Sequence, residues 1–283
     1  MESGPVKKNV LGSSSVAVRD ASARSLSQTQ PFTEEAILEA CAVTKRFDGF
    51  AAVSKVSWSL RPGEVAGIIG PNGAGKTTLF NLLTGMFPPN EGSVRFRGDD
   101  ITRCSPHKRV KGGLVRTFQL VSVFDRITVR ENLVLAVIPF AVTRARRAQF
   151  FLGQSDSPEI VGMCDEALRL VGLERKAMCL AMQLSYGEKR KLEIALALSL
   201  RPVLLLLDEP FAGLSDGEIA EVLELVQRVK STLSLVIIEH KISQIVDLVT
   251  RLSVMHEGRL IADGVPHDVL ADSWVRQVYW GRA

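Results

Sequence analysis

Cysteine is scarce in this sequence. The 283 residues include four cysteines, and no two of them have the spacing of zinc ligands or of a disulfide framework. They are Cys41, Cys104, Cys164 and Cys179. Sparse, unpaired cysteine is typical of proteins that work in a reducing compartment. We therefore expect neither structural disulfides nor a cysteine-ligated zinc ion.

Long apolar runs are also missing. The longest, residues 133–142, contains Pro139 and is half as long as the about 20 residues that a membrane-spanning helix needs. The first thirty residues contain no apolar segment of the kind found in secretory signal peptides. We expect a protein that is soluble or is held at a membrane by a partner.

A large excess of charge of one sign is absent as well. The chain has 35 Lys and Arg against 31 Asp and Glu, a net charge of +4. This balance gives no indication of nucleic acid as a partner, although it is compatible with a membrane surface. The basic clusters at 108–111 and 144–147 are predicted to be solvated faces.

The first thirty residues are rich in serine, with seven of them, and show no apolar periodicity. A segment with so little apolar surface cannot offset the entropy lost on folding. Residues 1–33 are therefore predicted to be a disordered tail, and residues 34–283 to form the folded domain.

An α/β pattern begins after the tail. Apolar runs that predict buried strands alternate with amphipathic segments that predict helices, which indicates a largely parallel sheet with helices on both faces. The predicted strands cover 37–47, 51–60, 65–69, 93–97, 114–118, 203–207, 233–238, 251–255 and 260–262. The predicted helices include 129–137, 159–171, 187–200, 217–229, 242–248, 266–270 and 274–280. A mostly helical stretch, about 120–200, indicates a subdomain inserted between strands.

A glycine-rich turn between a predicted strand and helix is the centre of this organisation. It reads Gly70, Pro71, Asn72, Gly73, Ala74, Gly75, Lys76, Thr77 and Thr78, a phosphate-binding loop. Glycines let the backbone N–H groups point at anionic oxygens, and the helix adds the positive end of its dipole. Lys76 is expected to reach the β- and γ-phosphates, and the Thr77 hydroxyl to ligate Mg²⁺.

Two adjacent carboxylates, Asp208 and Glu209, follow the apolar strand 203–207. Open α/β sheets bind their ligands at this end of the strands. Because side chains alternate along a strand, we expect Asp208 to hold Mg²⁺ and Glu209 to face an attacking water. A solvated turn is the alternative, and the phosphate loop in the same chain disfavours it.

The segment 184–188 reads Leu-Ser-Tyr-Gly-Glu and precedes a predicted helix. Ser185 and Gly187 place a hydroxyl and a backbone N–H at its N-terminus, where an anion can bind. Ordinary capping of the helix by Ser185 explains the same residues equally well.

Three further residues stand at strand ends. His240 can donate a hydrogen bond to a γ-phosphate, Gln119 can bridge Mg²⁺ and a water, and an exposed Phe47 can stack on a purine. A purely structural His240 and a core position for Phe47 remain open at this point.

Together these motifs resemble those of ATP-binding cassette (ABC) ATPases, in the same order, from about residue 36 onward. The segment 70–77 resembles the Walker A loop, and 204–209 resembles the Walker B strand. By the same resemblance Gln119 is the Q-loop glutamine, His240 the switch histidine and Phe47 the adenine-stacking aromatic. The segment 184–188 resembles the Leu-Ser-Gly-Gly-Gln signature, which is specific to this class.

The resemblance implies a P-loop NTPase fold with a mostly parallel sheet core, an antiparallel β subdomain and an inserted helical subdomain. It implies ATP and Mg²⁺, and a head-to-tail dimer with an identical or a different cassette. In that dimer Ser185 and Gly187, with Glu188 beside them, face the γ-phosphate held by the partner's Walker A loop. Tyr186, Glu188 and Ser215 depart from the family pattern, which puts the details of subunit coupling in doubt.

Four further segments indicate which subgroup of ABC ATPases the sequence resembles. The segments 116–119, 124–133, 192–195 and 275–281 look like those of the ATPases of branched-chain amino acid importers, whose close relatives serve urea and short amides. This implies a peripheral protein on the cytoplasmic face of the bacterial inner membrane. Its partners would be transmembrane permeases and, indirectly, a periplasmic binding protein.

Three other classes fit less well. Non-transport ABC proteins usually carry coiled-coil insertions or two cassettes, and this sequence has no heptad run and one Walker A loop. A catalytically inactive cassette is disfavoured by the presence of Lys76, Glu209 and His240. A phosphate-loop kinase or GTPase is disfavoured by the signature and by the Asp208–Glu209 pair.

Overall fold

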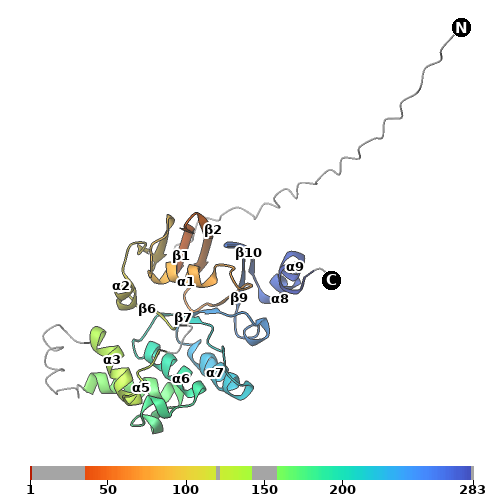
Figure 1. The fold of residues 1–283 in the computed structure, drawn as a ribbon. Helices are drawn as coiled ribbons and strands as arrows, with labels where there is room; N and C mark the ends of the chain where they lie inside the picture. Colours follow the sequence, from red (N-terminus) through yellow and green to blue (C-terminus); the bar gives the residue numbers. More distant parts are fainter. Residues whose placement is uncertain (2–35, 119–121, 142–157, 282–283) are drawn as a thin grey trace. The chain divides into compact units, whose positions relative to one another are not determined.

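The computed structural model describes residues 1, 36–118, 122–141 and 158–281 (Figure 1). Every helix and strand of these ranges belongs to the unit Phe32–Ala283. The tail predicted for residues 1–33 lies outside the described residues apart from Met1, and so does the basic cluster at 144–147.

The larger sheet in the described ranges has six strands in the order β10-β9-β3-β8-β7-β6. They are β3 (Val65–Ile69), β6 (Leu114–Arg116), β7 (Leu204–Asp208), β8 (Ser234–Ile238), β9 (Arg251–His256) and β10 (Arg259–Gly264). All neighbours pair in parallel except β10, which is antiparallel to β9. The mostly parallel core predicted from the sequence is confirmed.

A second sheet of four strands has the order β2-β1-β4-β5 and is antiparallel throughout. Its strands are β1 (Leu38–Phe47), β2 (Phe50–Leu60), β4 (Glu91–Phe96) and β5 (Asp99–Asp100). This sheet is the antiparallel β subdomain that the resemblance implies.

The central strands are buried on both faces because their side chains alternate between two cores. Leu204 and Leu206 of β7 pack with the antiparallel sheet and helix α1 (Lys76–Thr84). Leu205 and Leu207 pack in the other core, with the helical part of the chain. Because successive side chains of a strand point to opposite faces of the sheet, this all-apolar strand contributes to the cores on both sides of it.

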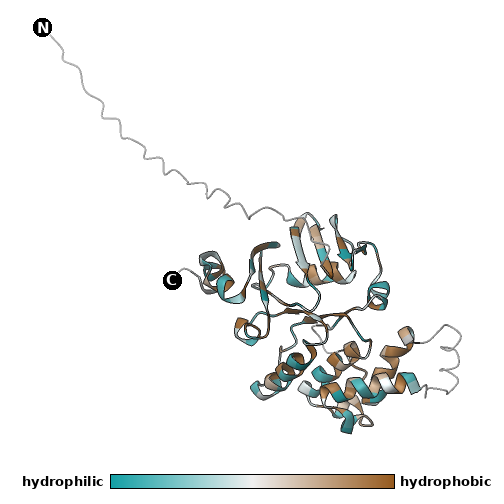
Figure 2. Cartoon of the chain, turned by 180° about the vertical axis from the view of Figure 1, so that it is seen from behind, coloured by the Kyte–Doolittle hydropathy of each residue, from teal (hydrophilic) through white to brown (hydrophobic). Residues whose placement is uncertain are grey.

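The helical part contains α3 (Val129–Ala141), α5 (Pro158–Val171) and α6 (Tyr186–Leu198), which pack against one another (Figure 1). Two 3₁₀ turns, η1 (Glu174–Lys176) and η2 (Ala181–Gln183), connect α5 to α6. Helix α6 also contacts α7 (Asp216–Val229) of the core. In Figure 2 these helices carry both hydrophobic and hydrophilic stretches, as expected for helices with one buried face. The predicted helical subdomain is thus confirmed where the chain is described.

Helix α1 is capped at its C-terminal end by Arg109 from α2 (Pro106–Lys111). The guanidinium Nη1 donates to the carbonyl oxygens of Leu82 (2.9 Å) and Leu83 (2.6 Å). These carbonyls lie in the last turn of the helix, where the N–H donors of a following helical turn are missing. Burial lowers the pKa of Arg109 to about 10. The prediction that residues 108–111 form a solvated face is therefore wrong at Arg109, because its hydrogen bonds to helix-end carbonyls replace those to water.

The remaining described elements are η3 (Ile242–Gln244), α8 (Pro266–Ala271) and α9 (Ser273–Trp280). The helix predicted over 242–248 is only this 3₁₀ turn. None of the helices in the described ranges combines the length and the apolar character that crossing a membrane requires.

Candidate active site

The glycine-rich turn between β3 and α1 is shaped by close backbone contacts. At Gly75 φ is +98°, and a Cβ atom would lie 2.4 Å from the carbonyl oxygen of Ala52, so a larger residue would be strained. At Gly70 a Cβ atom would lie 2.3 Å from the carbonyl oxygen of Met255. The turn is thereby fixed between β2 and β9.

Lys76 begins α1, and its ammonium group folds back over the turn. Nζ donates to the Gly70 carbonyl oxygen at 2.7 Å, and the side chain is buried. Burial lowers the pKa of Lys76, while the nearby carboxylates of Glu209, Asp208 and Glu239 oppose that shift. The structure therefore brings the predicted phosphate-binding lysine close to the carboxylates at the ends of β7 and β8.

The rest of the loop leaves donors accessible. Lys76 Nζ also reaches the Pro71 carbonyl oxygen, at 3.1 Å. Asn72, Gly73 and Thr77 are exposed, Thr78 is half-buried and Ala74 is buried. No side chain caps the N-terminus of α1 at Gly75. Its first backbone N–H groups are thus available to an anion at the positive end of the helix.

Asp208, at the end of β7, forms a buried ion pair with Arg116 at the end of β6. Arg116 Nη2 lies 2.5 Å from Asp208 Oδ2, and the two side chains are 6% and 1% exposed. Desolvation raises the pKa of the Asp208 carboxyl although Arg116 lowers it. The other oxygen, Oδ1, is buried and has no hydrogen-bond partner among the described residues. A buried carboxylate oxygen with a free lone pair fits a ligand of Mg²⁺, which prefers oxygen donors.

Glu209 follows with a backbone conformation that is rare for a residue with a side chain. Its φ is +48°, in the left-handed region. Two hydrogen bonds hold it there, from Glu209 N to the Ile238 carbonyl oxygen (3.0 Å) and from Ala212 N to the Glu209 carbonyl oxygen (3.1 Å). Local strain of this kind concentrates at functional sites.

His240 is exposed just beyond β8, and its neighbour Glu239 is fully buried. Glu239 Oε1 accepts from Phe211 N at 3.1 Å, and Oε2 accepts from His240 N at 3.3 Å. His240 Nδ1 lies 3.7 Å from Glu239 Oε2. Desolvation raises the pKa of Glu239 to about 7. One carboxyl group thus connects the loop after Glu209 to the predicted switch histidine.

Phe47 ends β1 and is 44% exposed, so its interpretation as a core residue is wrong. Its ring contacts Phe87 edge to face, with centroids 5.5 Å apart, and Lys45 lies 5.4 Å from its centroid. The β1–β2 hairpin that carries Phe47 also supplies the Ala52 carbonyl oxygen that touches Gly75. The aromatic ring and the phosphate loop are therefore linked through one hairpin.

Ser185 caps helix α6, as one of the two sequence interpretations predicts. Its hydroxyl accepts from Glu188 N at 3.2 Å, and its own N–H donates to Glu188 Oε2 at 3.0 Å. Glu188 also pairs with Lys176. This is a capping box, which leaves the interpretation of Ser185 and Gly187 as an anion site a prediction.

The phosphate loop and the segment 184–188 begin helices on different faces of the six-stranded sheet. Helix α1 packs with the even-numbered leucines of β7, and α6 with the odd-numbered ones. No hydrogen bond or ion pair among the described residues joins Ser185 or Gly187 to the residues 70–78. Within one chain the two predicted anion sites are therefore separate.

Gln119 lies outside the described residues, so its predicted role is not tested by geometry. The residue before it, Phe118, is held by a buried ion pair of α6, in which Arg190 Nη1 lies 2.7 Å from Glu193 Oε2. Phe118 N donates to Glu193 at 3.0 Å, and Arg190 donates to the Phe118 carbonyl oxygen at 3.2 Å. The strand end before Gln119 is thus tied to the helix that Ser185 begins.

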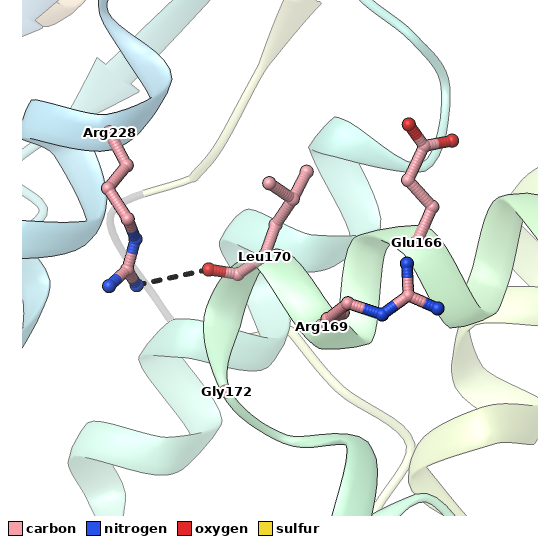
Figure 3. A pocket seen from close by; sticks show the side chains of 5 residues that line it. All are labelled: Glu166, Arg169, Leu170, Gly172 and Arg228. Atoms are coloured by element: carbon pink, nitrogen blue, oxygen red, sulfur yellow. Dashed lines mark hydrogen bonds between the residues drawn. The ribbon is translucent and has the colours of Figure 1, made fainter.

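A cavity of about 440 Å³ lies at the end of α5, against α7 (Figure 3). It is lined by Glu166, Arg169, Leu170, Gly172 and Arg228. Arg228 donates to the Leu170 carbonyl oxygen at 3.1 Å. None of the predicted site residues lines this cavity, so it belongs to the packing of the helical subdomain and not to the candidate active site.

Comparisons with known proteins agree with this geometry. A family model described as ABC transporter matches residues 53–212, more than half of the chain. The chain belongs to the ABC transporter family.

Individual relatives of this ABC protein cover nearly all of the folded domain. The high-affinity branched-chain amino acid transport ATP-binding protein BraF of Pseudomonas aeruginosa is 35% identical over 87% of this chain and 98% of its own. The corresponding LivG protein of Escherichia coli is 34% identical over the same shares. Among solved structures, the ATP-binding cassette MJ1267 in its ADP conformation has a TM-score of 0.78 and 32% identity, over 87% of this chain and 99% of its own.

Membership of the ABC transporter family establishes the general function of the chain. The ABC protein has the ATPase cassette fold, binds nucleotide and couples ATP hydrolysis to transport. Since its relatives are ATP-binding subunits of transporters, it works with membrane partner subunits.

Sequence reasoning missed three groups of this site: Arg116, Glu239 and Tyr279. The hydroxyl of Tyr279, on α9, is buried beside the phosphate loop, and burial raises its pKa. Glu239 could have been found from the sequence, because it directly precedes the predicted switch histidine His240. Arg116 and Tyr279 are far in sequence from their partners, so no local pattern pointed to them.

Proposed function

We propose that this chain is the ATP-hydrolysing subunit of a bacterial importer for branched-chain amino acids or a related small polar solute. It acts on the cytoplasmic face of the inner membrane. Two transmembrane permeases and a periplasmic binding protein complete the transporter. The names of the BraF and LivG relatives support the solute class, as do the sequence segments that resemble this group.

The nucleotide lies along the loop that begins at Gly70. Backbone N–H groups of residues 72–78 bind the phosphates, and Lys76 exchanges its carbonyl acceptors for the β- and γ-phosphate oxygens. Phe47 stacks on the adenine. The hydrogen bonds that Lys76 makes to the loop keep its ammonium group close to where a phosphate would bind.

Asp208 and Thr77, with Gln119, hold Mg²⁺ beside the phosphates. When bound, Mg²⁺ neutralises phosphate charge during phosphoryl transfer. The free, buried Oδ1 atom of Asp208 supports this assignment. Arg116 orients the carboxylate by holding its other oxygen.

Glu209 orients the attacking water and accepts its proton, and His240 donates a hydrogen bond to the γ-phosphate. Two observations support these roles. The backbone at Glu209 is strained, and the Glu239 carboxyl joins the loop after Glu209 to His240. Gln119 reports the occupancy of the site to the permeases.

Ser185 and Gly187, with Glu188 beside them, act on ATP bound to a second cassette. The placement of α1 and α6 on opposite faces of the sheet is the observation that carries this part of the proposal. Each chain then supplies two half-sites, and ATP joins two chains.

Uptake measurements in a bacterium that carries this gene test the proposal. Deleting the gene should abolish binding-protein-dependent uptake of radiolabelled leucine, and wild-type protein but not Glu209→Gln should restore it. Loss of urea or acetamide uptake with normal leucine uptake would assign the solute to the alternative class. Unchanged uptake of all these solutes would contradict the proposal.

A further inference from the structure

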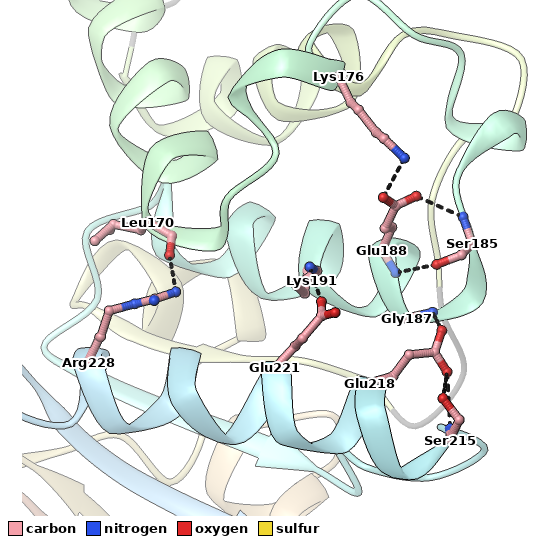
Figure 4. A network of polar contacts seen from close by, with 10 residues as sticks. All are labelled: Leu170, Lys176, Ser185, Gly187, Glu188, Lys191, Ser215, Glu218, Glu221 and Arg228. Carbon is pink, nitrogen blue, oxygen red and sulfur yellow. Dashed lines mark hydrogen bonds and ion pairs between the residues drawn. The ribbon is translucent and has the colours of Figure 1, made fainter.

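Glu218, in the first turn of α7, joins the loop just before its own helix to the start of α6, where Gly187 lies 31 residues earlier in the chain (Figure 4). Its Oε1 atom accepts from Gly187 N at 3.0 Å. Its Oε2 atom accepts from Ser215 N at 3.0 Å and from the Ser215 hydroxyl at 2.8 Å. One carboxylate therefore holds both the signature segment and the loop that precedes α7.

The two segments also fit each other sterically. A Cβ atom on Gly187 would lie 2.5 Å from Glu218 Oε1, so only glycine allows the carboxylate to lie against this backbone. A Cβ atom on Gly213 would lie 3.1 Å from the ring of Tyr186. Tyr186, which departs from the family signature, is thus accommodated by a glycine of the facing loop.

The electrostatics favour an anion at this point. Gly187 belongs to the first turn of α6, where the helix dipole is positive. Hydrogen bonds from Ser215 and Gly187 lower the pKa of the Glu218 carboxyl. Glu218 therefore receives a hydrogen bond from Gly187, one of the two residues that the proposed function assigns to the γ-phosphate of a second cassette.

We propose that Glu218 is a positioning residue of the signature half-site, which occupies the Gly187 donor beside Ser185 until a γ-phosphate replaces it. This inference rests on the proposed function. Two anions cannot share the same donors, because like charges repel and each N–H makes one strong hydrogen bond. When the phosphate on a second copy of this chain arrives, Glu218 leaves Gly187 and its hold on Ser215 loosens in the same step.

Other contacts keep α6 and α7 together during this exchange. Lys191 Nζ on α6 lies 2.6 Å from Glu221 Oε2 on α7, one turn beyond Glu218 (Figure 4). Further along α7, Arg228 donates to the carbonyl oxygen of Leu170 on α5, which packs against α6. The release of Glu218 is therefore a local change, and Glu221 offers a matched control in the same interface.

The test measures ATP-dependent dimerisation by sedimentation velocity in the Glu209→Gln background, which slows turnover. Glu218→Gln replaces the competing anion by an isosteric neutral amide. It should lower the ATP concentration for half-maximal dimer formation about fivefold, the difference between a charge-assisted and a neutral hydrogen bond. Glu221→Gln should leave that concentration unchanged. A role of Glu218 in helix capping alone predicts weaker dimerisation, so an unchanged or higher ATP requirement in Glu218→Gln would overturn the inference.

A second variant guards against a folding defect. Glu218→Asp keeps the charge and can still cap the α7 N-terminus, but it is one methylene too short to hold Gly187 as well. It should lower the ATP requirement in the same direction, and failure of both variants to do so would overturn the inference. If the Glu209→Gln parent itself binds ATP without dimerising, the proposed function fails instead.

Discussion

Arg116 and Asp208 form a buried ion pair between neighbouring strands β6 and β7, with Nη2 2.5 Å from Oδ2. Arg116 also donates to Asn81 Oδ1, and its guanidinium lies 5.5 Å from the centroid of the Phe80 ring on α1. The strand that precedes Gln119 is thereby connected to the Walker B carboxylate and to the phosphate-loop helix.

Removing the cation of this pair should be costly. In Arg116→Met the Asp208 carboxylate loses its partner while still buried, which should lower the free energy of unfolding by about 3–5 kcal/mol. Arg46→Met is the matched control, because its pair with Glu91 is 46% and 50% exposed and should contribute less than about 1 kcal/mol. Urea titration measures both. Equal, small losses would contradict the buried pairing.

Glu239 should make stability depend on pH. Burial raises its pKa from 4.5 to about 7, with Glu209 adding to the shift and with Arg190 and the N–H groups of Phe211 and His240 opposing it. Below pH 4.5 the carboxyl is protonated in both the folded and the unfolded chain. Between pH 4.5 and 7 the unfolded chain ionises first, so this group's contribution to stability is lost as pH rises, by about 3 kcal/mol in total.

Glu239→Gln is neutral at every pH and should lack this loss. The free energy of unfolding, measured by urea titration from pH 4.5 to 7.5, should therefore fall less steeply in the variant than in the wild type. Parallel curves for the two proteins would show that the carboxyl ionises normally.

Phe47 should contribute to nucleotide affinity through stacking. Phe47→Ala should weaken ATP binding by about 1–3 kcal/mol, the usual value of one stacked base. Phe124→Ala removes a ring that is also exposed but lies before α3, in the helical part, and should leave affinity unchanged. Titration of each purified variant with a fluorescent ATP analogue distinguishes them. Equal affinities of Phe47→Ala and the wild type would place the adenine elsewhere.

Glu209 should be needed for turnover and not for binding. Glu209→Gln keeps the shape of the side chain but cannot accept a proton, so ATP hydrolysis should fall by about 10²–10⁴-fold. ATP affinity should stay within about twofold of the wild type, since no phosphate contact is removed. Steady-state phosphate release measures the first quantity. Normal release in this variant would remove Glu209 from its proposed role.

Local patterns predicted most elements of the described fold. The run of leucines in β7 indicated a strand buried on both faces, and its alternate residues enter two different cores. Ser185 ahead of a predicted helix indicated, as one of two interpretations, the cap of α6, which is present. The phosphate loop, the end of β7 and the starts of α1 and α6 could be predicted because each depends on residues that are close together in the sequence.

Contacts across the sequence could not be predicted in this way. Arg116 and Asp208 are 92 residues apart, and their pairing depends on the register of β6 against β7. Arg109 was expected to be solvated because no sequence signal shows that its partners are carbonyls at the end of α1. The Glu218–Gly187 contact likewise needs α6 and α7 to be packed first.

In the proposed mechanism each chain carries two half-sites, on opposite faces of its sheet, and ATP joins two chains. Sedimentation velocity of Glu209→Gln with and without ATP tests it most directly, alongside the double variant Glu209→Gln, Ser185→Arg. We expect ATP to convert the first protein from monomer to dimer, and the second to bind ATP with the same affinity and remain monomeric. ATP-saturated protein that stays monomeric without the Ser185 substitution, or that dimerises equally well with it, would contradict the claim.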